Sequence, residues 1–292
     1  MPLEHEPDKN SGSPNLSGEE FSAALRSLPA ITEFHSDRDA IDRCLFVALA
    51  KQRLFFEGNA SHNFYFDPAS GTITFSFPGT DIPATTRQTY YLGYEDFEEE
   101  VFIWADRQPD FETLNPAIQG FIKEQRGKGA DCGLELLTHD FIKIKPLPES
   151  EVHAGVLICA ILSAVRDDVG LYFVSEARGK SHYFLIVRDR DSVKDGFVRL
   201  SDAFENDNKR LVFLAEAFPE MVKETEGIVE DYRKAFLCLA SALGLVADEA
   251  GNPHNVSRAY ATPIERSPYG VSALFQRGRF VSLDAKLPEG AC

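Results

Sequence analysis

Hydrophobic and polar residues follow two different periods along this chain, one typical of helices and one typical of strands. Beyond Ser36 the apolar positions recur every three or four residues as far as Phe55, which predicts a first helix that Ser36 caps and Gly58 ends. Residues 64–77 alternate instead, with apolar side chains at every second position on both sides of a turn at 68–71. This alternation predicts a β-hairpin.

The strand period continues through the next segment. Residues 84–94 are rich in threonine and tyrosine, and residues 101–105 alternate, so both segments predict strands, joined by an acidic turn over 95–100. Together with the hairpin they predict a four-stranded antiparallel meander with at least one buried face.

The second half of the chain mixes both periods. It predicts a helix that begins at Asn115 and Pro116 and an apolar helix over 149–167, followed by two strands at 169–175 and 182–188. Residues 200–243 are predicted to be mostly helical, with an interruption at Pro219. A loop over 248–255 and a last hairpin over 271–284 complete the predicted elements. The predicted fold class is α+β: an antiparallel β-meander with packed helices, a second strand pair, C-terminal helices and a hairpin.

The polar N-terminal segment differs from the rest of the chain. Its first residues are rich in proline, glycine and serine, which predicts a disordered tail over residues 1–33. No long polar linker divides the remainder, so we expect residues 34–292 to form a single α+β domain.

Net charge narrows the possible partners. The chain has 292 residues, and its 30 basic and 46 acidic residues give 30 − 46 = −16. Such a protein repels the phosphate backbone of nucleic acids and anionic lipid, so we expect neither to be a partner. A basic protein is the partner that an acidic surface favours.

Cysteine usage and the apolar runs bear on the cellular compartment. The first twenty residues contain no apolar stretch like that of a signal peptide, and the longest apolar run, residues 152–165, is too short to cross a bilayer. The five cysteines are scattered and form no CxxC pair, which favours reduced thiols. We therefore expect a cytoplasmic protein.

Four short motifs come in a familiar order: GTITFS at 71–76, YYLGY at 90–94, VFIWAD at 101–106 and LELLT at 134–138. This order resembles an uncharacterised bacterial domain family whose members carry LTFS, LGS or LGT, and TWLWAW strand motifs. The resemblance covers roughly residues 45–190, and only Trp104 remains of the family's tryptophan cluster. It implies a bacterial α+β protein, and because the family has no assigned activity, it implies no catalytic residue.

The motifs that would predict a cofactor or a metal are missing. No glycine-rich phosphate loop occurs in the predicted domain. Cys132 and His139 fall on opposite faces if residues 134–138 form a strand, and His153 and Cys159 do not converge on one helix face. We therefore expect neither a cofactor nor a metal site.

The acidic turn and its neighbouring aromatic residues form the candidate binding site. Large aromatic side chains occur on both faces of the adjoining strands. We therefore expect the second face to be buried as well, either by a helix of this chain or by a partner. The carboxylates suit a basic partner, while a merely solvated turn is the simpler interpretation. The predicted binding residues are Tyr94, Asp96, Glu98, Glu99, Glu100 and Trp104.

Three functional hypotheses remain at this point. The first is a non-enzymatic module that binds another protein, as an immunity protein or a chaperone does. The alternative is a hydrolase of unrecognised type that uses Cys132 or His182. The third is a structural protein that forms a homodimer.

Overall fold

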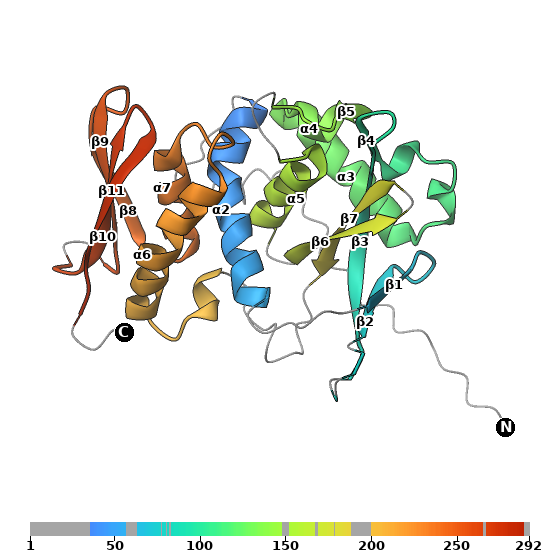
Figure 1. Cartoon of the computed structure of the whole chain (residues 1–292), viewed down its shortest axis with the longest axis horizontal. Helices are drawn as coiled ribbons and strands as arrows, with labels where there is room; N and C mark the ends of the chain where they lie inside the picture. The colour runs from blue at the N-terminus through green and yellow to red at the C-terminus, as the bar shows by residue number, and fades with distance from the viewer. Residues whose placement is uncertain are drawn as a thin grey trace.

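A computed structural model of the chain describes residues 36–56, 63–76, 83–147, 152–166, 169–177, 179–187, 200–264 and 267–288, together with residues 78, 79 and 81. The tail predicted over residues 1–33 lies outside them. The fold is α+β, as predicted, and Figure 1 shows its layers: a four-stranded sheet, helices α6 (Asp207–Glu224) and α7 (Tyr232–Ala242), the long helix α2 (Asp37–Phe56) beside α5 (Ala154–Val165), and a seven-stranded sheet.

Helix α2 begins where the sequence predicts and stands at the centre of the layers. The backbone N–H of Asp39 donates to the Oγ of Ser36 at 3.3 Å, which satisfies one of the donors left free at a helix start. The helix packs against both α5 and α7. The Nζ of Lys51 donates to the backbone oxygens of Ser163 and Arg166 at the end of α5, and this contact fixes the two helices together.

The seven-stranded sheet contains both the predicted meander and the predicted strand pair. Its strand order is β1-β2-β3-β4-β5, β7 pairs with β3, and β6 pairs with β7, always antiparallel. Both predictions are confirmed, and the two groups of strands belong to one sheet. The bounds are β1 (Asn63–Asp67), β2 (Thr72–Ser76), β3 (Thr85–Asp96), β4 (Val101–Trp104), β5 (Phe141–Lys143), β6 (Val169–Ala177) and β7 (Lys180–Val187).

The two faces of this sheet have different surroundings. On the inner face Phe102 and Tyr183 are buried, and α5 packs against β3, β6 and β7. On the outer face the sheet curls, because Phe66 of β1 reaches the rings of Tyr91 and Phe184 at 5.8 and 5.0 Å between centroids. The curl encloses a second group of aromatic side chains on this face.

Helix α3 (Pro116–Cys132) starts at the predicted position, because the Asn115 side chain accepts the backbone N–H of Ala117. It ends at Gly133, whose φ of 68° is a left-handed conformation that glycine adopts without steric cost. The next residues were considered as a strand, but they form the short helix α4 (Glu135–Thr138). Single-turn 3₁₀ helices, η1 (Ala105–Arg107) and η2 (Phe111–Thr113), lie between β4 and α3.

The C-terminal part places α6 and α7 against the second sheet, of order β11-β10-β9-β8. The predicted last hairpin is confirmed. The elements are the 3₁₀ helix η3 (Leu200–Ala203), β8 (Val246–Gly251), β9 (Val256–Thr262), β10 (Gly270–Gln276) and β11 (Arg279–Lys286).

Two predictions for this part are wrong. Pro219 does not interrupt the helix, because α6 continues through it and buries Phe218 and Met221 on either side. The first half of the predicted loop over 248–255 is a strand, since residues 248–251 belong to the segment 246–251 that pairs with β9. Strand β8 is an exposed edge, and an edge strand can carry polar residues such as Asp248 and still form a ladder.

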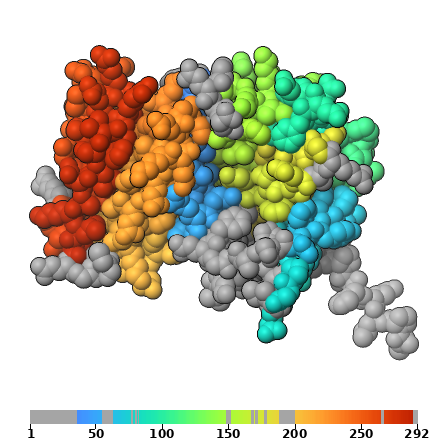
Figure 2. All heavy atoms as spheres, viewed as in Figure 1, coloured from blue at the N-terminus to red at the C-terminus, as the bar shows by residue number. Residues whose placement is uncertain are grey.

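One continuous hydrophobic core joins the layers. Phe218 of α6 contacts Phe46 of α2 at 5.2 Å and Phe275 of β10 at 6.4 Å between ring centroids. The space-filling view accordingly shows the orange helices lying directly against the blue α2, with the red sheet beyond them (Figure 2). No helix in the described part of the chain is long and apolar enough to cross a membrane.

Candidate functional site

The acidic turn between β3 and β4 is shaped by Asp96. Its Oδ1 accepts the backbone N–H groups of Glu98 and Glu99 at 3.1 and 3.4 Å. Glu98, Glu99 and Glu100 are exposed, and none of them forms an ion pair with another described residue. Lys180 of β7 pairs with Asp96 at 3.1 Å, and this hydrogen bond lowers the pKa of Asp96. The three following carboxylates therefore remain available to a partner.

The strand register continues this turn into a row of side chains on the outer face of the sheet. Phe141 of β5 lies opposite Ile103 of β4, which lies opposite Tyr94 of β3, which lies opposite His182 of β7. Phe141 is 60% exposed and the other three are half-buried. We call this row and the turn the hairpin-end surface; its residues are Tyr94, Asp96, Phe97, Glu98, Glu99, Glu100, Ile103, Phe141, Lys180 and His182.

His182 belongs to an aromatic group rather than to a catalytic pair. Its Nδ1 is 3.0 Å from the Tyr91 hydroxyl, and its ring lies beside those of Tyr91 and Tyr94. Partial burial, with Lys180 nearby, lowers the pKa of His182. Among the described residues no cysteine, serine or carboxylate side chain forms a hydrogen bond with this imidazole.

Cys132 lies elsewhere, at the end of α3. Burial and the neighbouring Asp131 raise the pKa of its thiol, whereas a nucleophilic cysteine needs a lowered pKa. Among the described residues, neither Cys132 nor His182 is therefore paired with a side chain that would activate it for hydrolysis. Within the described ranges, no group of three or more His, Cys, Asp or Glu side chains is arranged to hold a metal ion.

Trp104 requires a correction to the predicted binding set. It is fully buried and packs edge-to-face on Phe102 at 5.5 Å, with the Arg126 guanidinium over its ring at 5.8 Å. Successive strand residues face opposite sides of a sheet, so Trp104 points inward where Ile103 points outward. Trp104 is a core residue, and the prediction that it lies on a binding surface is wrong.

Glu95 was expected to belong to the solvated turn, but it is fully buried. Its carboxylate accepts hydrogen bonds from the Tyr183 hydroxyl at 2.6 Å and from the backbone N–H of Gly155 at 2.9 Å, and its Oε2 lies 3.0 Å from the Nδ1 of His153. Gly155 is in the first turn of α5, where the helix dipole favours a negative charge. Strand alternation, which puts Glu95 on the opposite face from Tyr94, is the signal that could have identified it.

Glu95 and the neighbouring Phe97 tie the acidic turn to α5. The ring of Phe97 lies 6.0 Å from that of His153, the residue that precedes the helix. Because His153 also contacts the buried Glu95, the position of the turn is set by the core. The acidic turn is therefore anchored to the core through Glu95 and Phe97.

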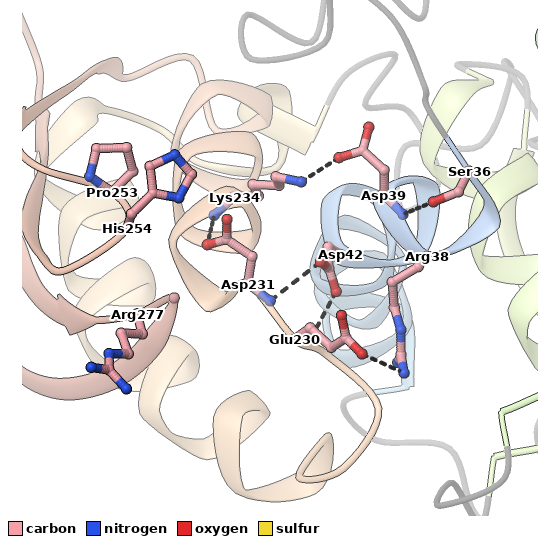
Figure 3. A pocket seen from close by; sticks show the side chains of 11 residues that line it. Ser36, Arg38, Asp39, Asp42, Glu230, Asp231, Lys234, Pro253, His254 and Arg277 are labelled. Atoms are coloured by element: carbon pink, nitrogen blue, oxygen red, sulfur yellow. Dashed lines mark hydrogen bonds and ion pairs between the residues drawn. The ribbon is translucent and has the colours of Figure 1, made fainter.

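A second candidate site is a pocket beside the start of α2, with a volume of about 510 Å³. Figure 3 shows that the first turns of α2 and α7, the β8–β9 loop and the β10–β11 turn surround it. The buried Asp42 of α2 accepts the backbone N–H groups of Glu230 and Asp231 at 2.9 and 3.2 Å. Burial raises the pKa of Asp42 to about 6, against the opposing effect of these hydrogen bonds.

The fold and these two sites define an α+β protein with an acidic hairpin end and a charged pocket. A family model matches residues 38–190, which is 153 of the 292 residues, and the chain therefore belongs to a family of unknown function (DUF6882). This match confirms the resemblance to an uncharacterised domain family. No curated protein and no solved structure matches the chain.

The family region runs from α2 to the end of β7, so it includes the hairpin-end surface. Helices α6 and α7 and the four-stranded sheet lie beyond it. The pocket draws residues from both parts, since Asp39 and Asp42 belong to the family region whereas Lys234 and His254 do not.

Proposed function

We propose that this is a non-enzymatic bacterial and cytoplasmic protein that binds a basic segment of another protein on the hairpin-end surface, as an immunity protein or a chaperone would. The observation that carries the proposal is the combination, on one end of the sheet, of exposed apolar side chains with carboxylates that form no ion pair with another described residue. Phe97 and Phe141 are 42% and 60% exposed, beside Glu98, Glu99 and Glu100.

The two kinds of side chain support different aspects of binding. Exposed aromatic residues are typical of the centre of protein interfaces, where they supply most of the affinity. Carboxylates at the rim act mainly on the rate of encounter with a positively charged partner. A basic partner whose apolar residues contact Phe97 and Phe141 would use both.

The remaining hypotheses receive less support from the geometry. Among the described residues, Cys132 and His182 have separate surroundings, so neither forms the nucleophile–base pair that the hydrolase alternative requires. A second copy of this chain on the same surface would bring three carboxylates of each copy together, in a protein of net charge −16. This repulsion disfavours a homodimer formed through the hairpin end.

The test begins with identification of the partner by a photo-crosslinking amino acid placed at Phe97 and, as a matched control, at Tyr260 of β9. Both positions are similarly exposed, at 42% and 39%. We expect an adduct at position 97 and not at 260, and a basic segment at the crosslinked position of the partner. The purified partner should then bind the wild-type chain and lose affinity on Phe97→Ala.

The proposal fails if both positions give the same adducts, or if the purified partner binds the Phe97→Ala and wild-type proteins equally well. It also fails if the crosslinked segment is acidic. Circular dichroism and thermal unfolding of each variant show whether the fold is retained, so that a loss of affinity is assigned to the surface.

A further inference from the structure

The edge strands of the two sheets differ in how they are protected. An edge strand exposes backbone N–H and C=O groups that can pair with another chain, and proteins usually block such groups. In the seven-stranded sheet α2 blocks β6: the Nε2 of Gln52 donates to the backbone oxygen of Tyr172 at 3.0 Å, and its Oε1 accepts the backbone N–H of Tyr172 at 3.2 Å. Strand β5 has only three residues. Neither strand therefore offers a long open edge.

The edges of the four-stranded sheet are protected by charge. Strand β8 contains Asp248 and Glu249. Strand β11 contains Arg279, Asp284 and Lys286, and its pairing with β10 shifts register part-way along. Charged side chains and such irregularities are among the features that keep two edges from pairing with each other.

Strand β1 is the exception. Its sequence NFYFD carries one charge, at Asp67, and two exposed aromatic side chains, Tyr65 at 68% and Phe64 at 39%. Among the described residues it pairs with β2 alone, and its other backbone hydrogen bond, from Gly71 to Asp67, lies in the connecting turn. Figure 1 shows β1 at the opposite end of the molecule from the four-stranded sheet. One edge of β1 is therefore open to another strand.

The charge of the surroundings indicates which strand this edge accepts. Strand β2 contains no charged residue, and its Thr74, which lies opposite Tyr65, has its hydroxyl 2.8 Å from that of Thr86 in β3. Two copies of a chain with net charge −16 repel each other wherever their acidic surfaces meet. At β1 a second copy meets little like charge, whereas a basic partner finds little to attract it.

We propose that two copies of this chain pair antiparallel through β1, as a symmetric dimer whose two-fold axis passes beside Tyr65. The same patch of both copies then forms the interface, as a two-fold axis requires. The sheets of the two copies join edge to edge, and main-chain hydrogen bonds between the two strands supply the basic attraction.

The sequence of β1 is complementary to itself in this register. An antiparallel pairing centred on Tyr65 places Phe64 opposite Phe66 of the second copy, and Asn63 opposite its Asp67. Directly opposite residues share a face of the sheet, so the phenylalanines meet on the side where Phe64 already contacts Phe173 at 5.0 Å between centroids. On the other side the Asn63 amide can donate to the Asp67 carboxylate. Each of these pairs occurs twice in the dimer.

The length of β1 sets the expected strength. A pairing of five-residue strands buries less than the roughly 1,200–2,000 Å² that is typical of stable complexes. We therefore expect a dimer that forms and dissociates with protein concentration.

Sedimentation equilibrium of the full chain, from about 1 µM to about 500 µM, tests the proposal. The average mass should rise with concentration from 32.5 kDa towards twice that value. Tyr65→Lys should weaken association by more than about tenfold, because two ammonium groups would meet at the axis. The matched control Val281→Lys adds the same charge to β11, at a side chain that is 52% exposed, and should associate like the wild type.

A second pair of variants tests the register and covers the case in which Tyr65→Lys does not fold. Asn63→Asp puts two carboxylates opposite each other and should weaken association severalfold. The double variant Asn63→Asp, Asp67→Asn exchanges the two side chains, keeps the wild-type net charge and should restore association. Circular dichroism checks the fold of each variant.

A wild type that stays monomeric over the whole range overturns the proposal and leaves the edge to a strand of another protein. The proposal is also overturned if a folded Tyr65→Lys associates like Val281→Lys. It fails equally if the double variant associates no better than Asn63→Asp, because the two copies would then not pair in this register.

Discussion

The two sheets of this protein meet solvent in different ways. The seven-stranded sheet buries its inner face against helices and curls so that much of its outer face is also enclosed, through contacts such as Phe66 with Phe184. The four-stranded sheet packs only one of its faces against helices, α6 and α7. Its inner positions include the buried Ala259 and Phe275, while Val256 and Tyr260 are 46% and 39% exposed.

This difference between the two sheets helps to identify which exposed residues belong to a binding surface. An antiparallel sheet with one solvated face is ordinary, so scattered exposed residues on the C-terminal sheet need no partner to explain them. In the first sheet Phe97 and Phe141 are exposed beside the acidic turn, and Phe64 and Tyr65 are exposed on the edge strand β1. Both places also lie inside the family region, whereas the C-terminal sheet does not.

The largest expected effect comes from the inner face of the first sheet. Phe102→Ala removes a fully buried ring that packs against Trp104 and Tyr183. It should lower the free energy of unfolding by about 3–5 kcal/mol, because the lost contacts leave a cavity. The control Tyr260→Ala, on the solvated face of the second sheet, should change it by about 0.5 kcal/mol or less. Denaturant titrations that gave equal losses would contradict the assignment of faces.

The free energy of unfolding should depend on pH through Asp42, which joins the family region to the C-terminal part. The folded protein holds a proton on Asp42 up to about pH 6, whereas the ordinary pKa of 3.8 applies in the unfolded chain. The contribution of this group to stability is therefore complete below pH 3.8 and is lost as the pH rises to about 6.

The variant Asp42→Asn isolates this effect. The wild type should lose stability relative to the variant by on the order of 3 kcal/mol between pH 3.5 and pH 7, at about 1.4 kcal/mol for each pKa unit. Denaturant titrations of both proteins at several pH values give this difference. A stability difference that stays constant with pH would show that Asp42 titrates normally.

The buried carboxylate of the first sheet predicts a smaller, specific loss. Tyr183→Phe removes the hydroxyl that donates to Glu95 at 2.6 Å and leaves the ring in place. Hydrogen bonds to charged groups contribute about 1.5–3 kcal/mol, so stability should fall by that amount. Tyr260→Phe, at an exposed position, is the matched control and should have no effect. If both variants unfold at the wild-type denaturant concentration, Glu95 is not held as described.

Much of the fold could be predicted because its strands and helices keep clear periods. The meander, the second strand pair and the last hairpin each alternate, and Ser36 and Asn115 cap the helices that they were expected to cap. The errors occur where tertiary packing overrides the local signal. Pro219 lies within a helix whose neighbouring residues are buried, and β8 is polar because it is an edge.

The candidate site was predicted only in part, for reasons of register and distance. The acidic segment was identified, but the point where the strand becomes the turn was not, so Glu95 and Trp104 were assigned to the surface. Ile103 and Phe141 join the surface through strand pairing between distant segments. The pocket joins Asp42 to Glu230, which are 188 positions apart, and no local pattern indicates such a contact.

The smallest expected effect on stability is at the acidic turn. The triple variant Glu98→Gln, Glu99→Gln and Glu100→Gln changes three exposed side chains without ion pairs among the described residues, so the free energy of unfolding should shift by about 0.5 kcal/mol or less. Thermal unfolding checks this result. A large loss would mean that these carboxylates hold the fold together, and they could not then be treated as a free docking surface.

The same triple variant gives the most direct test of the proposed function, through its association rate with the crosslinked partner at low salt. Its control removes the same charge elsewhere, by Glu216→Gln, Glu226→Gln and Asp248→Asn, three exposed residues of the C-terminal part. We predict a several-fold slower association and a weaker salt dependence for the hairpin variant, with the control close to the wild type, because charges at an interface rim act locally on the encounter. Equal rates for the two variants would contradict docking at the hairpin end.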